Sequence, residues 1–172
     1  MICPRCGQNN LPGSDTCRHC QCDLTALDRP APLDRVEHSL MADTVGSLRP
    51  PPPVVVGPGA TVADALRVLM AEDVGAVLAV NAAGRLAGIF SERDLLLKVA
   101  GLDTPLDELP LDQYMTPRPE TVSAADTLAF ALHKMDVGGY RHLPVVADGR
   151  PVGILSVRDL VRHMTRICGE KR

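Results

Sequence analysis

The chain has 172 residues, of which 45% are apolar and 2% aromatic, and it carries a formal net charge of −3. This mixed charge argues against a polyanion binder, and no apolar run approaches the ~20 residues that span a bilayer. The N-terminus lacks the basic and apolar regions of a secretory signal, and the paired cysteines favour a reducing compartment. We therefore expect a cytoplasmic protein that does not enter a membrane.

The chain begins with two C-x-x-C pairs, formed by Cys3, Cys6, Cys17 and Cys20. Four thiolates on two such turns suit tetrahedral Zn²⁺, with Zn–S distances of about 2.3 Å. Residues 1–30 resemble a short zinc ribbon, in which the metal supplies the folding energy that a small core lacks. A redox pair or unligated thiols are the alternatives. Cys22 lies too close to Cys20 in sequence to join easily, so we expect it to be a spare thiol.

The same 30 residues contain three arginines, three aspartates and no aromatic side chain. Nucleic-acid affinity depends on phosphate contacts, and single-strand binders add base stacking. The ribbon is therefore predicted to contact protein or to be structural, and nucleic acid is not the expected partner.

Residues 31–53 are predicted to form a linker, with a short helix at Asp34–Met41. Four prolines, Pro50–Pro53, end the linker, and they exclude helix and favour an extended polyproline segment. A stiff spacer is the preferred interpretation, and a ligand for a polyproline-binding domain is the alternative. Matching prolines in Met115–Pro119 indicate that both halves of the following region are entered in the same way.

A sequence of twelve residues occurs twice in the chain. Gly84–Leu95 reads GRLAGIFSERDL and Gly149–Leu160 reads GRPVGILSVRDL, with eight positions identical. A spacing of about 65 residues indicates two copies of one supersecondary unit. We place the first repeat at 48–105 and the second at 111–168.

Each repeat predicts the order strand, helix, strand, strand, helix. For the first repeat the elements are a strand at Pro53–Val56, a helix with a capping box that begins at Thr61, strands at Val77–Val80 and Leu86–Phe90, and a helix at Glu92–Val99. For the second they are a strand at Pro119–Val122, a helix with an apolar stripe from Leu128, strands at Leu143–Val146 and Pro151–Leu155, and a helix at Val157–Met164. One copy has too little surface to bury, so the two are expected to pack sheet against sheet.

This order, with the ending Gly-h-h-Ser-x-Arg-Asp-Leu (h, apolar), resembles the cystathionine β-synthase (CBS) domain over about residues 45–165. Two copies in tandem resemble a CBS pair, or Bateman module. The predicted fold class is α+β, with two β-α-β-β-α repeats packed with pseudo-twofold symmetry and preceded by a small zinc ribbon. The whole layout resembles bacterial proteins that join such a ribbon to a CBS pair.

Both repeats place Ser and Asp three positions apart where the closing helix begins, at Ser91 and Asp94 and at Ser156 and Asp159. One interpretation is a capping box that satisfies free backbone N–H groups. The other is a nucleotide site, because a helix N-terminus attracts phosphate and a carboxylate can accept hydrogen bonds from both ribose hydroxyls. The spacing alone does not separate the two, but in CBS pairs the matching aspartate holds the ribose of adenosine nucleotides.

The resemblance implies two clefts, each combining the aspartate of one repeat with the first strand of the other. The first cleft would contain Ser91, Arg93, Asp94, Thr121 and Val122. The second would contain Ser156, Arg158, Asp159, Val55 and Val56. Phosphate contacts are expected in the second cleft from Arg141 and His142, where the first repeat has Gly75 and Ala76. For Arg141, a solvated surface position is the alternative.

We find no nucleophile paired with a base and no phosphate-binding loop in the sequence, so we do not expect an enzyme. The predicted function is that of a regulatory sensor which binds AMP, ADP or ATP, carries structural Zn²⁺ and signals to an unidentified protein partner. The resemblance also implies a homodimer formed through the CBS pair. The alternatives are an interaction scaffold with empty clefts and a regulator associated with nucleic acid through the ribbon.

Overall fold

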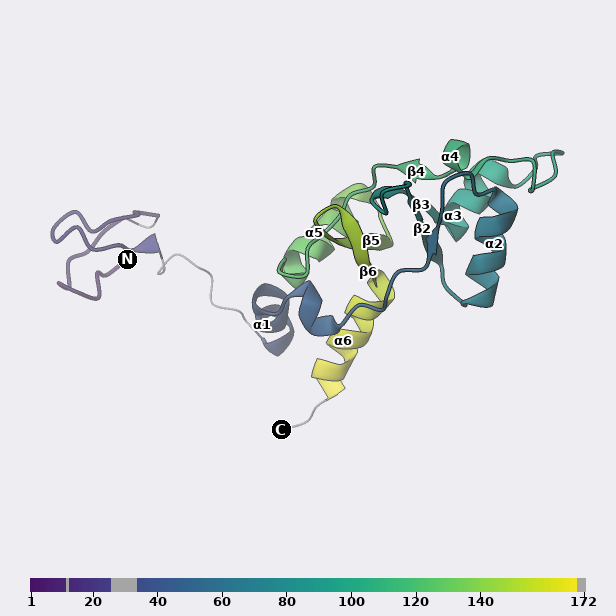
Figure 1. Ribbon diagram of the computed structural model, residues 1–172. Helices are drawn as coiled ribbons and strands as arrows, with labels where there is room; N and C mark the ends of the chain where they lie inside the picture. The colour runs from purple at the N-terminus through teal and green to yellow at the C-terminus, as the bar shows by residue number, and fades with distance from the viewer. Residues whose placement is uncertain (12, 26–33, 170–172) are drawn as a thin grey trace. The chain divides into compact units, whose positions relative to one another are not determined.

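Two compact units, Met1–Asp34 and Arg35–Arg172, make up the chain in the computed structural model (Figure 1). The structure describes residues 1–11, 13–25 and 34–169. The predicted boundary between ribbon and linker, at residues 30 and 31, lies outside the described residues. None of the helices in the described part of the chain is long and apolar enough to cross a membrane.

The first repeat contributes three strands to a four-stranded sheet in the order β1-β2-β3-β4, and the fourth strand comes from the start of the second repeat. The strands of this sheet are β1 (Val55–Val56), β2 (Ala76–Val80), β3 (Leu86–Ser91) and β4 (Thr116–Pro117). The helices of the first repeat are α2 (Val62–Ala71), the single turn α3 (Glu92–Asp94) and the π-helical turn η3 (Leu95–Val99), and the second repeat begins with α4 (Leu111–Tyr114). Strand β1 pairs parallel to β2, whereas the β2–β3 and β3–β4 pairs are antiparallel. The predicted strands, and the helix after Thr61, are confirmed.

The second repeat has the same order with fewer paired strands. After α4 and β4, its elements are α5 (Leu128–Gly138), β5 (His142–Ala147), β6 (Arg150–Ser156) and α6 (Val157–Gly169). Strands β5 and β6 pair antiparallel. The strand predicted at Pro119–Val122 is reduced to a single parallel bridge between Val122 and Val145.

Side-chain caps begin the helices where the sequence predicts them. Thr61 accepts a hydrogen bond from the backbone N–H of Asp64, and the Asp64 carboxylate accepts one from the N–H of Thr61. Ser91 and Asp94 make the same reciprocal pair. The closing helix of the first repeat nevertheless changes after Asp94 into a π-helical turn, in which the N–H of Ala100 donates to the carbonyl of Leu95.

The segment before each repeat closes the core of the other repeat. Before the first repeat lie α1 (Arg35–Ala42), which confirms the predicted short helix, and the 3-10 turn η2 (Val45–Leu48). Val45 is fully buried in the core of the second repeat, and its N–H donates to Asp126. Leu111, 66 positions later, is buried in the core of the first repeat, and its N–H donates to Ala60.

This exchange joins the two repeats into one unit. Helix α1 packs against α5 and α6, as Figure 1 shows. The sheets also meet, as predicted, because Ile154 of β6 packs against a cluster on β2 and β3 that includes Leu78 and Ile89. The polyproline segment lies along β6: the N–H of Ile154 donates to the carbonyl of Pro51 at 3.4 Å.

Candidate functional site

A cavity of about 550 Å³ lies between the two repeats at the start of α3. Its walls come from the end of β3, from α3, from the segment around β4 and from the loop between α5 and β5. Residues whose side chains bear on its chemistry are Ser91, Arg93, Asp94, Thr116, Arg118, Glu120, Tyr140, Arg141 and His142. We call this cavity the first cleft, because it contains the aspartate of the first repeat.

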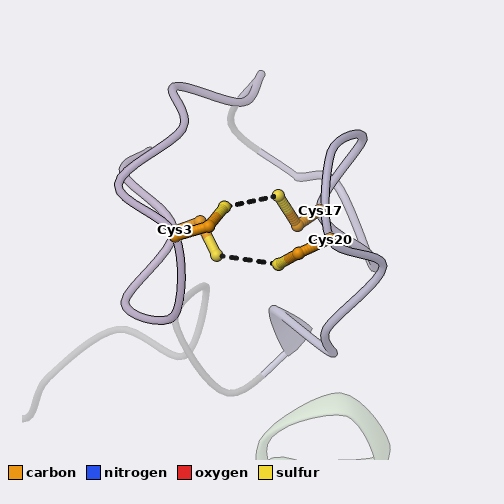
Figure 2. A group of neighbouring side chains, drawn as sticks. Cys3, Cys17 and Cys20 are labelled. Atoms are coloured by element: carbon orange, nitrogen blue, oxygen red, sulfur yellow. Dashed lines mark hydrogen bonds between the residues drawn. The ribbon is translucent and has the colours of Figure 1, made fainter.

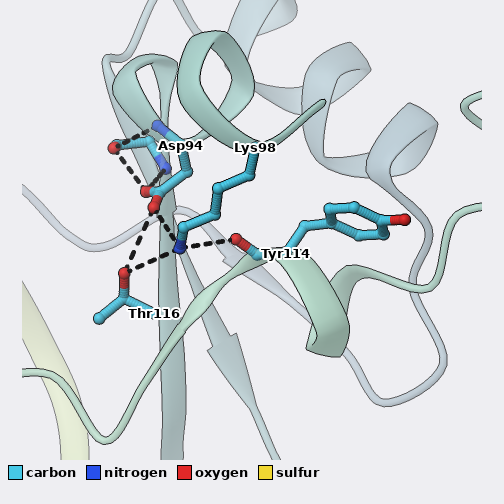
Figure 3. Close-up of polar contacts among 5 residues, drawn as sticks. Asp94, Lys98, Tyr114 and Thr116 are labelled. Atoms are coloured by element: carbon cyan, nitrogen blue, oxygen red, sulfur yellow. Dashed lines mark hydrogen bonds and ion pairs between the residues drawn. The ribbon is translucent and has the colours of Figure 1, made fainter. Parts of the chain in front are cut away.

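Asp94 is fixed in the first cleft by contacts to both carboxylate oxygens (Figure 3). Oδ2 accepts from the N–H of Ser91 at 2.9 Å and from its hydroxyl at 2.7 Å. Oδ1 forms an ion pair with Lys98 at 2.7 Å, and the Lys98 ammonium also donates to the carbonyl of Tyr114 and to Thr116. Burial would raise the pKa of Asp94, but hydrogen bonds from Lys98 and Ser91 outweigh it and leave the pKa below its usual value.

The charges that line the first cleft favour an anion. Its two carboxylates are each paired with a lysine, Asp94 with Lys98 and Glu120 with Lys134 at 2.8 Å. Three arginines face the same cavity, namely Arg93, Arg118 and Arg141. Arg93 donates to the carbonyl of Gly139 at 3.4 Å, which ties α3 to the turn that ends α5.

Arg141 and His142 line the cavity of Asp94, whereas the sequence-based grouping placed them with Asp159. His142 begins β5 and Arg141 directly precedes it. The His142 ring lies over Gly75 of the first repeat, where a Cβ atom would be 3.3 Å from the ring. The absence of a side chain at Gly75 therefore admits the imidazole. A smaller cavity of about 150 Å³ also connects both residues with Ser156 and Arg158.

The surroundings of His142 favour its neutral form. Burial lowers the pKa of His142, and the positive charges of Arg141 and Arg158 lower it further. An anion placed against Arg141 and His142 would reverse this effect and favour the charged imidazole. A phosphate bound beside Arg141 and His142 would thus raise the pKa of His142.

A second cavity, of about 470 Å³, surrounds Asp159, and we call it the second cleft. Its described lining residues are Ser47, Leu48, Arg49, Asp159, Arg162, His163 and Arg166. Asp159 repeats the cap of Asp94, since its Oδ2 accepts from the N–H and hydroxyl of Ser156 at 2.9 and 2.6 Å. Its Oδ1 pairs with Arg162 at 3.3 Å, and this arginine side chain is 79% exposed.

The residues expected from the first strands lie away from the described walls of both clefts. Val56 and Val122 are buried in the cores of the first and second repeats. Val55 is 47% exposed, and the carbonyl of Thr121 accepts a hydrogen bond from Lys134. Thr116 and Arg118 occupy the wall of the first cleft where Thr121 and Val122 were expected.

Sequence reasoning also missed Lys98, Tyr140 and Arg118. The i,i+4 spacing of Asp94 and Lys98 on a predicted helix was an available signal. Tyr140 is the one aromatic residue among the described residues that line the first cleft. No sequence pattern indicated Arg118, because only the pairing of β4 with β3 brings this residue to the wall of the first cleft.

The four cysteines of the two C-x-x-C pairs form a cluster in the N-terminal unit. Their sulfur atoms all lie within 4.8 Å of one another. The sulfur atoms of Cys3 and Cys20 are 3.6 Å apart, and so are those of Cys6 and Cys17. Figure 2 shows Cys3 on the opposite side of the cluster from Cys17 and Cys20. These separations fit four sulfurs around one ion at about 2.3 Å.

The backbone around the cluster is shaped for sulfur ligation. The N–H of Gly7 donates to the carbonyl of Cys3 and that of Gln21 to Cys17, and both Gly7 and Gln21 adopt positive φ. Hydrogen bonds from the backbone N–H of Cys20 lower the pKa of Cys17 to about 6, although burial opposes them. Cys22 lies beside the cluster, with its sulfur 3.2 Å from that of Cys3.

The CBS domain family matches residues 45–101 and 111–166, which is more than half of the chain. The chain belongs to the CBS-domain family. It carries two CBS domains in tandem, and each match contains one copy of the repeat and one Ser-x-x-Asp cap.

Individual relatives support the same assignment. An uncharacterised 17.7 kDa protein of Acidianus ambivalens is 31% identical over 125 residues, covering 72% of this chain and 74% of its own. The Arabidopsis thaliana protein CBSCBSPB5 is 36% identical over 128 residues, but this match spans only 23% of its length. The CBS domain protein PAE2072 of Pyrobaculum aerophilum, solved in complex with AMP, is 29% identical with a TM-score of 0.63, covering 72% of this chain and 98% of that one.

Proposed function

We propose that the CBS pair is a non-catalytic sensor that binds an adenosine nucleotide in the first cleft. CBS-domain proteins are generally regulatory, and the similar protein PAE2072 was solved with AMP. The observation that carries the proposal is the first cleft itself, in which a fixed carboxylate and three arginines share one cavity. Its volume of about 550 Å³ lies within the range of about 300–1,000 Å³ that is typical of small-molecule sites.

Each part of the nucleotide has a counterpart in the first cleft. The ribose hydroxyls donate to Asp94, whose charge is maintained by Lys98 and whose position is fixed by Ser91. Arg141 and His142 contact the phosphate, and binding raises the pKa of His142 by placing a negative charge beside it. Tyr140 supplies an aromatic wall for the base.

Isothermal titration of the full chain with AMP, ADP and ATP tests the proposal. We expect one adenosine nucleotide to bind per chain and to raise the melting temperature. At 100 times its Kd, the nucleotide should increase the free energy of unfolding by about 2.7 kcal/mol. GMP is the control for the base. If no adenosine nucleotide binds at millimolar concentration, the proposal is wrong and the scaffold with empty clefts is the better interpretation.

For the N-terminal unit we propose one structural Zn²⁺ held by Cys3, Cys6, Cys17 and Cys20. The fully buried Leu24, with Cys3 and Cys17, forms a core too small to fold a unit of this size alone. We expect one zinc per chain after gel filtration, and none after Cys17→Ser. Cys22→Ser and Cys168→Ser are the controls and should keep the metal. Zinc loss from Cys22→Ser alone would contradict the assignment of the four ligands.

We also propose that the protein acts as a homodimer and signals to a protein partner. Large apolar side chains are exposed on α2 and on the π-helical turn: Met70 is 75%, Leu96 69% and Leu97 72% exposed. Burial of such side chains between two copies would be favourable. Sedimentation of the wild type and of Leu96→Glu with Leu97→Glu tests this, with a dimer expected for the wild type and a monomer for the variant.

A further inference from the structure

The N-terminal cluster contains one thiol more than a tetrahedral metal needs. The two C-x-x-C pairs supply the four sulfurs that a structural zinc takes, and Cys22 is a fifth cysteine beside them. Its sulfur lies 3.2 Å from that of Cys3, which is closer than the 3.6 Å between the sulfurs of Cys3 and Cys20. Cys22 is therefore held against a proposed ligand although the metal does not require it.

The backbone fixes Cys22 in this position. The N–H of Cys17 donates to the carbonyl of Cys22 at 2.9 Å, and Thr16 and Asp23 form an antiparallel bridge. These contacts fold the segment after the second C-x-x-C turn back onto the residues that lead into the turn. The contact between the sulfurs of Cys22 and Cys3 is thus part of the fold of this unit.

The two sulfurs differ in their access to solvent. Cys3 is 1% exposed and packs with Cys17 and Leu24, whereas Cys22 is only partly buried. Oxidation of a cysteine depends on exposure as well as on thiolate character. A small oxidant therefore reaches Cys22 first, and the product forms in contact with Cys3.

We propose that Cys22 is a peroxide-sensitive thiol that forms a disulfide with Cys3 and thereby releases the zinc. The proposal rests on the zinc site proposed above and assigns a role to the thiol that the site leaves over. The chemistry needs hydrogen peroxide as the oxidant, and it proceeds in two steps.

In the first step the Cys22 sulfur attacks one oxygen of the peroxide, the O–O bond breaks, and Cys22 sulfenic acid and one water are formed. In the second step the Cys3 thiolate attacks the Cys22 sulfur, so that the S–S bond forms and the S–O bond breaks. The hydroxide that leaves takes up a proton and becomes the second water. Two electrons have then passed from the two sulfurs to the peroxide. A disulfide bond is about 2.0 Å long, so sulfurs that start 3.2 Å apart need to move by only about 1 Å.

The disulfide removes one of the four zinc ligands. Three sulfurs remain, and one of them, Cys6, is exposed. Because zinc ligation supplies the folding energy of a unit with so small a core, the N-terminal unit loses its fold together with the metal. The CBS pair has separate cores and keeps its structure. Oxidation thus changes the N-terminal unit alone, and a reducing thiol with added zinc restores it.

Treatment of the zinc-loaded full chain with hydrogen peroxide tests the proposal. A chromogenic chelator measures the released zinc, and mass spectrometry of alkylated peptides locates the disulfide. We expect the wild type to release its zinc and to contain a disulfide between Cys3 and Cys22. Cys22→Ser should bind zinc like the wild type but release it about tenfold more slowly or less, because the serine hydroxyl cannot form the disulfide. Cys168→Ser, which also removes a thiol outside the four ligands, is the matched control and should release zinc like the wild type.

The two proposals on this unit fail separately. If the chain binds no zinc, the metal site is wrong, and peptide mapping still tests the disulfide between Cys3 and Cys22. If zinc is bound but Cys22→Ser releases it as fast as the wild type, or if the disulfide joins two other cysteines, the role of Cys22 is overturned and this residue only packs beside the ligands.

Discussion

The two clefts share one motif and differ in almost everything that surrounds it. In both, Ser Oγ and the backbone N–H hold Asp Oδ2, at 2.7 and 2.9 Å for Asp94 and at 2.6 and 2.9 Å for Asp159. Asp94 then pairs with Lys98, whose side chain is 39% exposed, and is itself 13% exposed. Asp159 pairs with Arg162, whose side chain is 79% exposed, and is itself 28% exposed. The motif therefore determines the helix cap, and the segments brought in from elsewhere determine the chemistry of each cleft.

The asymmetry has one main structural source. Arg141 and His142 belong to the second repeat by sequence but line the cavity of the first. At the corresponding positions the first repeat has Gly75 and Ala76, which offer no charge to the second cleft. The second cleft obtains its positive charge from η2 and α6 instead.

Removing Arg141 and His142 should produce the largest difference in AMP affinity between changes in the two clefts. The double variant Arg141→Ala and His142→Ala should weaken AMP binding by about 10- to 100-fold, because two charge-assisted contacts to phosphate are lost. Arg162→Ala with Arg166→Ala is the matched change in the second cleft and should leave the AMP Kd within about twofold. Isothermal titration measures both, and equal losses would show that the clefts do not differ as described.

The aromatic wall of the first cleft can be moved without touching a charged residue. A Cβ atom on Gly138 would lie 2.0 Å from the Tyr140 ring, so Gly138→Ala forces the ring to a new position. We expect AMP binding to weaken by about fivefold, and Tyr140→Ala to do the same. Val137→Ala, at an exposed position of the same helix, is the control. If Gly138→Ala and Tyr140→Ala both bind AMP like the wild type, Tyr140 does not contact the nucleotide.

A smaller effect should appear in the pH dependence of stability. Because the pKa of His142 is lowered in the folded protein, the unfolded chain binds more protons once the pH falls below about 6.5. The melting temperature without ligand should therefore fall by ~2–5 °C between pH 7.5 and 5.5. Asp94 contributes only near pH 4 and below, since its pKa is also lowered.

His142→Gln checks this assignment, because glutamine keeps polarity but does not titrate. Its melting temperature should depend less on pH than that of the wild type over the same interval. A pH dependence identical to that of the wild type would place the responsible group elsewhere. The first repeat has Ala76 at this position, so no matching effect is expected from it.

Local features of the fold could be read from the sequence, because they depend on neighbouring residues. The duplicated strands and the caps at Thr61, Ser91 and Ser156 follow from period, turn residues and spacing. The cysteine cluster follows from two C-x-x-C turns.

The long-range features could not be read in the same way. The exchange of Val45 and Leu111 between the repeats depends on how the two units pack, although the offset of 66 residues does relate these positions. The direction of the Arg141 and His142 side chains depends on the space above Gly75, which no local pattern encodes. This is why the cavity that joins Arg141 and His142 to Asp94 could not be predicted from the sequence, whereas the helix caps could.

Titration of AMP into the matched variants Asp94→Ala and Asp159→Ala tests the central claim most directly. Each variant loses an equivalent helix cap, so the cost in stability should be similar, at about 1 kcal/mol. We predict that Asp94→Ala weakens AMP binding by tenfold or more, whereas Asp159→Ala leaves it within about twofold. A loss confined to Asp159→Ala, or an equal loss in both variants, would contradict the assignment of the nucleotide to the first cleft.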